Sequence, residues 1–109
     1  MLSTHVLDTV TGAPAAGIDV SLYRLDNSQR ALVATAQTDD DGRIARIGGE
    51  RPEPGVYELL FAVGAYFARH QTASFYDEIP VRFTLDASAR KHHVPLLLSP
   101  YGYSTYRGS

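Results

Sequence analysis

The chain has 109 residues, of which 44% are hydrophobic and 20% are charged. This length predicts one domain over residues 1–109 with a modest core, so a site should be a surface cleft or a subunit interface. Ten basic against twelve acidic residues give a net charge of -2. That charge provides no electrostatic reason to bind nucleic acid or an anionic membrane surface.

The absence of cysteine excludes disulfides, thiolate catalysis and cysteine-based metal centres. Small secreted domains usually depend on disulfides, so this composition favours the cytoplasm. Residues 1–8 have neither the basic nor the apolar region of a signal peptide. The longest apolar run without a charge, residues 59–68, is about half of the ~20 residues that span a bilayer. We therefore expect a soluble, cytoplasmic protein.

Short strands separated by turn signals follow one another along the chain. Apolar and polar residues alternate at 18–23 and 81–85, the period of a strand with one buried face. Asp-Asn-Ser at 26–28 predicts the turn of a hairpin, because Asp and Asn tolerate turn conformations. Further extended segments are expected at 4–10, 31–35, 57–63, 93–98 and 103–107, and one short helix at 64–71.

This pattern predicts an all-β fold, a two-sheet antiparallel β-sandwich of seven to eight strands with one short helix near residues 64–71. Residues 57–63 are the most apolar segment and should form a central strand. Pro95 cannot donate a hydrogen bond to a sheet, so it predicts an edge strand or a bulge.

An acidic turn at residues 38–43 suggests calcium at first sight. Aligning Gly42 with the sixth position of an EF-hand loop places Gln37 first and Gly48 last, where Asp and Glu are required. A solvated β-turn is therefore the favoured interpretation. Arg43, which follows the turn, would by itself be a surface residue.

The four histidines are the remaining candidates for chemistry: His5, His70, His92 and His93. Three neutral imidazoles can form a catalytic zinc site, and a single catalytic histidine is also open. Adjacent side chains on a strand point to opposite faces, so His92 and His93 cannot readily bind one metal. No carboxylate stands at ligand spacing beside them, and His70 should lie on the surface of the helix.

The last nine residues are unusually aromatic for a chain end, with Tyr101, Tyr103 and Tyr106 followed by Arg107. They follow an apolar run at 94–98 with little interruption, whereas chain ends are usually polar and frayed. The pattern is equally compatible with the wall of a site or an interface and with an aromatic edge strand.

Three motifs in order resemble the transthyretin-like family. Leu-Ser-Thr-His-Val-Leu-Asp-Thr at 2–9, with Gly-Ala-Pro-Ala-Ala-Gly at 12–17, resembles the start of that family, and residues 38–43 resemble its second motif. Residues 93–109 are similar to the terminal signature of its enzymatic branch, whose Tyr-Arg-Gly-Ser ending is lacking in the hormone carriers. The resemblance covers essentially the whole chain.

The resemblance implies an enzyme that hydrolyses 5-hydroxyisourate, the unstable product of urate oxidation, to 2-oxo-4-hydroxy-4-carboxy-5-ureidoimidazoline. It implies catalytic roles for three residues, His5, Arg43 and His93. It implies substrate contacts from four, His5, Arg43, Tyr106 and Ser109. A histidine with a pKa near ~6.5 can activate water, and the planar guanidinium of arginine suits the oxygens of a urate-like ring.

One motif departs from the family pattern. Where the family commonly has a His-Tyr-His triplet, this chain has Lys91, His92 and His93. We assign the catalytic role to His93, because it keeps its spacing to Pro95. Contacts at this end of the strand should therefore differ from those in the family.

The implied hydrolysis needs no cofactor, because the ring carbonyl is already activated; a zinc-dependent variant stays open because of the histidines. The resemblance also implies a homotetramer, a dimer of dimers with sites in a channel between dimers. Two other functions are compatible with the fold: a carrier of an aromatic ligand in that channel, and an interaction domain. The pair His5 and His93 favours the hydrolase, since a carrier would not need it.

Overall fold

The computed structural model describes residues 1–87 and 91–109, and within them the chain forms nine strands and one helix. The strands are β1 (Leu2–Asp8), β2 (Ala13–Pro14), β3 (Asp19–Asp26), β4 (Gln29–Gln37), β5 (Arg43–Ile47), β6 (Gly55–Phe61), β7 (Ile79–Leu85), β8 (His92–Ser99) and β9 (Gly102–Thr105). The helix α1 (Val63–Arg69) connects β6 to β7. In the part of the chain described, no helix has the length and apolar character needed to cross a bilayer.

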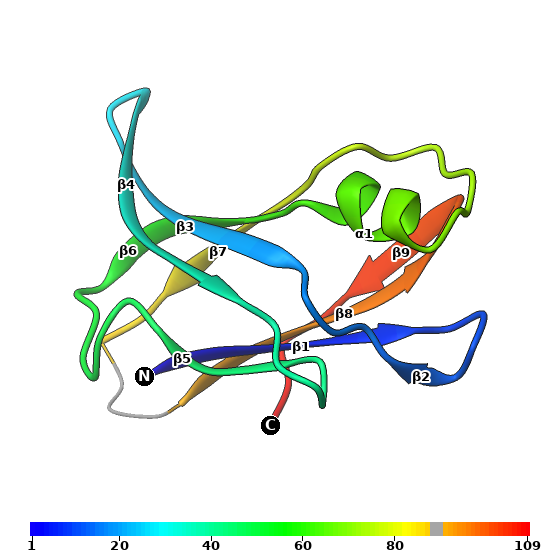
Figure 1. Ribbon diagram of the computed structural model, residues 1–109. Coiled ribbons are helices and arrows are strands. Elements are labelled where there is room, and N and C mark those ends of the chain that lie inside the picture. Colours follow the sequence, from blue (N-terminus) through cyan, green and yellow to red (C-terminus); the bar gives the residue numbers. More distant parts are fainter. Residues whose placement is uncertain (88–90) are drawn as a thin grey trace.

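The strands form two layers, which Figure 1 shows with α1 at one end. One layer, the β3–β6 sheet, has the order β4-β3-β6-β7. The other, the β1–β8 sheet, has the order β2-β1-β8-β9, and β5 pairs with the same edge of β1 as β2 does. The predicted two-sheet sandwich with one short helix is therefore confirmed, and residues 57–63 fall largely on β6, an inner strand as expected. The described residues form nine strands rather than the predicted seven to eight, since β2 and β5 lie where the sequence indicated only turns and loops.

Alternating apolar residues on the strands create the core. Along β1, every second side chain from Leu2 to Asp8 is buried, and β7 shows nearly the same alternation. The largest fully buried side chains come from both sheets and fill the space between them: Leu2, Val6, Val20, Leu22, Leu59, Phe61, Ile79, Leu96 and Leu98. Burial of each such side chain stabilises the fold by about 1.5–3 kcal/mol, so this alternation fixes which residues face outward.

The strand directions differ from the prediction at one pair. β1 and β8 run parallel, with Leu2 beside His92 and Asp8 beside Leu98, whereas all other pairs are antiparallel. The first and the penultimate strand of the chain are thus neighbours in the middle of a sheet. Nothing in their local composition distinguishes a parallel partner from an antiparallel one.

Pro95 does not mark an edge strand, because β8 lies inside its sheet between β1 and β9. The regular pairing of β8 with β9 nevertheless ends at Leu96 and Thr105, and it returns only as an isolated bridge between His93 and Gly108. The interruption falls at Pro95, which has no N–H to donate. The Thr105 hydroxyl donates to the Pro95 carbonyl at 2.7 Å and holds the strands together there.

The helix is fixed to the sandwich by a buried polar contact. The Tyr66 hydroxyl donates to the Asp8 carboxylate at 3.0 Å. Burial and the neighbouring carboxylate raise the pKa of Tyr66 to about 12. His70 is exposed, as expected, and its Nδ1 lies 2.8 Å from the Tyr66 carbonyl at the end of α1.

Candidate active site

The outer face of the β1–β8 sheet carries the three side chains with the expected catalytic chemistry. His5 on β1 lies opposite Arg43 on β5, and Ser3 on β1 lies beside His93 on β8. These residues alternate with core residues on their strands, so their side chains point away from the core. The structure therefore brings His5, Arg43 and His93 together from three neighbouring strands.

The acidic turn before β5 places Arg43. The Asp39 carboxylate accepts hydrogen bonds from the N–H groups of Asp41 and Arg43, each at 2.9 Å. Gly42 has a φ of +72° and its carbonyl accepts a hydrogen bond from the Val6 N–H at 2.8 Å. A β-carbon on Gly42 would lie 2.5 Å from the Val6 carbonyl oxygen. The turn can approach β1 this closely only because residue 42 is glycine.

His93 is held by contacts on both sides, from the Ser3 side chain and from the Gly108 backbone. Its Nδ1 lies 2.8 Å from the Ser3 hydroxyl, and its carbonyl accepts a hydrogen bond from the Gly108 N–H at 2.7 Å. Burial lowers the pKa of His93, and the positive charge of Arg43 and the nearby His5 lower it further. The imidazole is therefore neutral at neutral pH, the form that can accept a proton from water.

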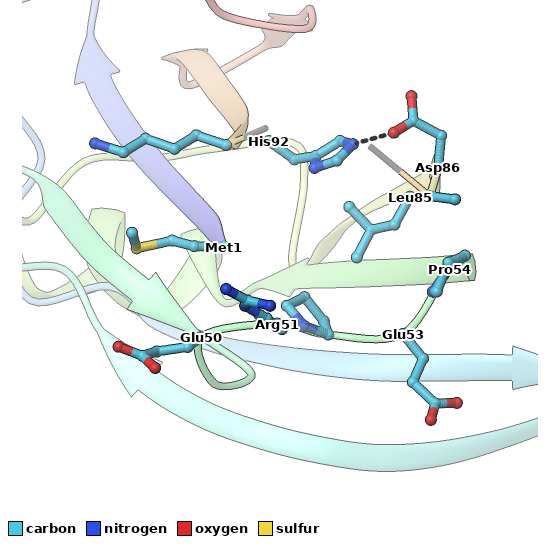
Figure 2. A pocket seen from close by; sticks show the side chains of 11 residues that line it. Met1, Glu50, Arg51, Glu53, Pro54, Leu85, Asp86 and His92 are labelled. Carbon is cyan, nitrogen blue, oxygen red and sulfur yellow. Dashed lines mark hydrogen bonds and ion pairs between the residues drawn. The ribbon is translucent and has the colours of Figure 1, made fainter. Parts of the chain in front are cut away.

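His92 points to the opposite face from His93, as predicted for adjacent residues on a strand. It is buried, and its Nε2 lies 3.2 Å from the Asp86 carboxylate. Figure 2 marks this contact with a dashed line. Asp86 also forms an ion pair of 3.8 Å with Arg107, so this cluster ties the C-terminal segment to the residues after β7. Among the residues described, no three His, Asp or Glu side chains are grouped closely enough to hold a metal ion.

A pocket of about 580 Å³ lies beside His92 (Figure 2). The described residues that line it come from the 50–54 loop, from residues 85–87 and from the start of β8, and they include Lys91. Its lining has mixed charge, because it includes Glu50 and Glu53 as well as Arg51. His5, Arg43 and His93 are not among its lining residues, so this pocket lies apart from the candidate site.

The two expected substrate contacts in the C-terminal segment lie near His93. Tyr106 is 57% exposed and lines a second groove of about 230 Å³ with His93 and residues 81–84 of β7. Ser109 is exposed and follows Gly108, which bridges to His93. Among the described contacts, none joins Tyr106 or Ser109 to His5 or Arg43 within one chain.

The sequence did not indicate that Ser3 and Gly108 contact His93 and so shape the site. A β-carbon on Gly108 would lie 2.6 Å from Cδ2 of His93. The Ser3 contact depends on the parallel register of β1 and β8, which has no local sequence signal. For Gly108, the only signal in the sequence was its position next to Ser109, an expected substrate contact.

The comparisons with known proteins agree with this geometry. Residues 2–108 match the model of the HIUase/Transthyretin family. A 5-hydroxyisourate hydrolase of Mesorhizobium japonicum is 52% identical to the chain, over 99% of this chain and 91% of that protein. The chain therefore belongs to the HIUase/Transthyretin family, whose fold is the sandwich described above.

Solved structures from two branches of this family superpose on the chain. The Klebsiella pneumoniae 5-hydroxyisourate hydrolase superposes with a TM-score of 0.88 and 39% identity, covering 99% of this chain and 98% of that one. Sea bream transthyretin in complex with thyroxine superposes with a TM-score of 0.92 but only 28% identity, covering 98% and 93%. The backbone is thus common to both branches, while the sequence is more similar to the hydrolases.

Proposed function

We propose that residues 1–109 act as one domain that hydrolyses 5-hydroxyisourate to 2-oxo-4-hydroxy-4-carboxy-5-ureidoimidazoline. The observation that carries this proposal is the convergence of His5, Arg43 and His93 on one outward face of the β1–β8 sheet. An imidazole can activate water as a general base, and a guanidinium can stabilise the oxyanion. Relatives that carry the hydrolase name are 43–52% identical over nearly the whole chain.

The reaction assigns a role to each group. One imidazole takes a proton from water while the water oxygen attacks a ring carbonyl carbon. The Arg43 guanidinium stabilises the negative charge that develops on the carbonyl oxygen, an effect worth about 3–4 kcal/mol where one donor supplies it. The ring C–N bond then breaks, the proton passes to the departing nitrogen, and a carboxylate forms.

Within one chain Arg43 is exposed and His5 and His93 are half-buried, which favours a site completed by other subunits. We propose a homotetramer, a dimer of dimers, in which Tyr106 and Ser109 contact the substrate between dimers. The exposed Tyr106 side chain supports this arrangement, because large aromatic groups are enriched at interfaces. Light scattering at assay concentration should give a tetramer, and a fully active monomer would contradict the shared site. We place the enzyme in the cytoplasm, in keeping with a chain without cysteine.

The test of this proposal is substrate decay with His5→Asn and His93→Asn. Removal of a general acid or base should lower kcat by about 10²–10⁴-fold in at least one variant. Near-full activity in both variants would refute the assignment. Binding of an aromatic ligand without any turnover by the unmodified protein would instead indicate a carrier.

A further inference from the structure

The orientation of the His93 imidazole is set by two residues that flank it in the sheet. On one side lies Ser3, its register partner on β1, and on the other lies Gly108, its bridge partner in the C-terminal segment. His93 sits on an inner strand, with β1 on one side and an isolated bridge to the C-terminal segment on the other. The ring is therefore held between two elements that are far apart in the sequence.

The Ser3 side holds one nitrogen of the ring. The Ser3 hydroxyl lies 2.8 Å from Nδ1, within hydrogen-bond distance. With the hydroxyl oxygen as acceptor, Nδ1 carries the ring proton, because the partner of one ring nitrogen sets the tautomer.

The Gly108 side closes the opposite edge of the ring. A β-carbon at residue 108 would lie 2.6 Å from Cδ2, 3.2 Å from Cγ and 3.3 Å from Cβ of His93. Any residue other than glycine would displace the imidazole, since non-bonded carbon atoms pack at about 3.5–4.0 Å. The glycine is thus required for close approach to His93.

We propose that Ser3 and Gly108 are positioning residues that hold the His93 imidazole by its Nδ1 and Cδ2 edges and leave Nε2 as its reacting nitrogen. The inference rests on the proposed function, because it assumes that His93 takes part in the hydrolysis. It assigns Ser3 and Gly108 no contact with the substrate. Their effect is exerted through His93 alone.

The first experiment is a nitrogen-15 NMR measurement of the His93 ring, which needs no substrate. In the unmodified protein at pH 8, the proton of neutral His93 should reside on Nδ1. Ser3→Ala should move it towards Nε2, Ser3→Thr should restore Nδ1, and Ser21→Ala, a serine of the other sheet, should have no effect. An Nε2 proton in the unmodified protein, or the same tautomer in Ser3→Ala, would overturn the proposal whatever the protein hydrolyses.

The second experiment is steady-state hydrolysis of 5-hydroxyisourate by the same variants. Loss of one hydrogen bond in Ser3→Ala should lower kcat about tenfold with little change in KM, and Ser3→Thr should recover it. Displacement of the ring in Gly108→Ala should lower kcat about 100-fold. The control is Gly102→Ala, where the nearest atom would be 3.7 Å from the added carbon, and it should keep full activity.

The two experiments separate the possible failures. No hydrolysis by the unmodified protein, together with the expected tautomer change, would refute the proposed function and leave the positioning of His93 intact. Hydrolysis that Ser3→Ala and Ser3→Thr reduce equally would refute the role of the hydroxyl. Gly108→Ala with full kcat would refute the role of the glycine. If that variant does not fold, Ser3→Ala and Ser3→Thr still test the positioning of His93 by Ser3.

Discussion

His5 and Arg43 lie directly opposite each other on the antiparallel strands β1 and β5. Residues in such a pair have Cβ atoms about 4.5–5.5 Å apart, so one small molecule can contact both side chains at once. The turn that precedes Arg43 and the core-facing neighbours of His5 fix this relationship before any substrate binds.

The geometry at Arg43 predicts that lysine cannot replace it. A guanidinium offers a planar set of donors to two oxygens, whereas an ammonium is a point charge on a flexible stem. We expect Arg43→Lys to lower kcat/KM about 100-fold or more, with unchanged thermal unfolding. Arg46→Lys, on the same strand and paired with Glu50 at the surface, is the matched control and should keep full activity. Equal kcat/KM for Arg43→Lys and the unmodified enzyme would contradict the role given to Arg43.

The lowered pKa of His93 predicts activity that persists into mildly acidic solution. If neutral His93 accepts the proton, kcat/KM should fall only as the pH drops below the ordinary histidine value of 6.5. The folded state binds this proton more weakly than the unfolded chain, so His93 weakens the fold below that pH and has no such effect above it. A pH–rate profile whose acid midpoint lies at or above 6.5 would speak against His93.

The causes of the lowered His93 pKa predict which variants raise that pKa most. Arg43 lowers the pKa of His93 more than His5 does. Arg43→Ala should therefore raise the pKa of His93 more than His5→Asn does, and both should raise it. Titration of the His93 ring protons by NMR measures this directly. A lower pKa in Arg43→Ala would show that the two side chains are not neighbours in solution.

Substitution of Gly42 and Gly12 separates the cost of backbone strain from the cost of a steric clash with β1. Both have a φ of +72°, but an added β-carbon meets the Val6 carbonyl at residue 42 and nothing within 4 Å at residue 12. Gly12→Ala should cost about 1–2 kcal/mol of unfolding free energy from backbone strain alone. Gly42→Ala should cost about 1–3 kcal/mol more and also reduce activity, because it moves the turn that carries Arg43. Equal losses of stability would show that the turn does not touch β1.

The acidic turn predicts a difference between two adjacent aspartates. The Asp39 carboxylate accepts two backbone hydrogen bonds in the turn, and Asp40 is exposed beside it. Asp39→Ala should cost about 1–2 kcal/mol, as loss of a capping carboxylate does, and should lower kcat/KM through Arg43. Asp40→Ala should change neither. Denaturant unfolding and the hydrolysis assay together test this pair.

Much of the sandwich was predictable because its strands alternate between buried and exposed residues. The hairpin between β3 and β4 followed from Asp-Asn-Ser, and the structure gives Asn27 and Ser28 the positive φ values of such a turn. The central position of β6 followed from its apolar composition. These features are local, so the sequence carries their signal directly.

The contacts between distant segments were not predictable in the same way. The parallel pairing of β1 and β8 joins residues about 90 positions apart, and it alone places Ser3 beside His93. The prediction of an edge strand or a bulge at Pro95 was wrong. An inner strand also tolerates a missing N–H where its hydrogen-bonded pairing with a neighbour is interrupted. The approach of Gly108 to His93 likewise depends on where the C-terminal segment returns to β8.

The most direct test of the proposed function is an ultraviolet assay on freshly generated 5-hydroxyisourate, with the unmodified protein and Arg43→Ala side by side. The unmodified protein should accelerate decay of the substrate well above its spontaneous rate, and Arg43→Ala should lose about 100-fold or more of that acceleration. Decay at the spontaneous rate with the folded, unmodified protein would contradict the account.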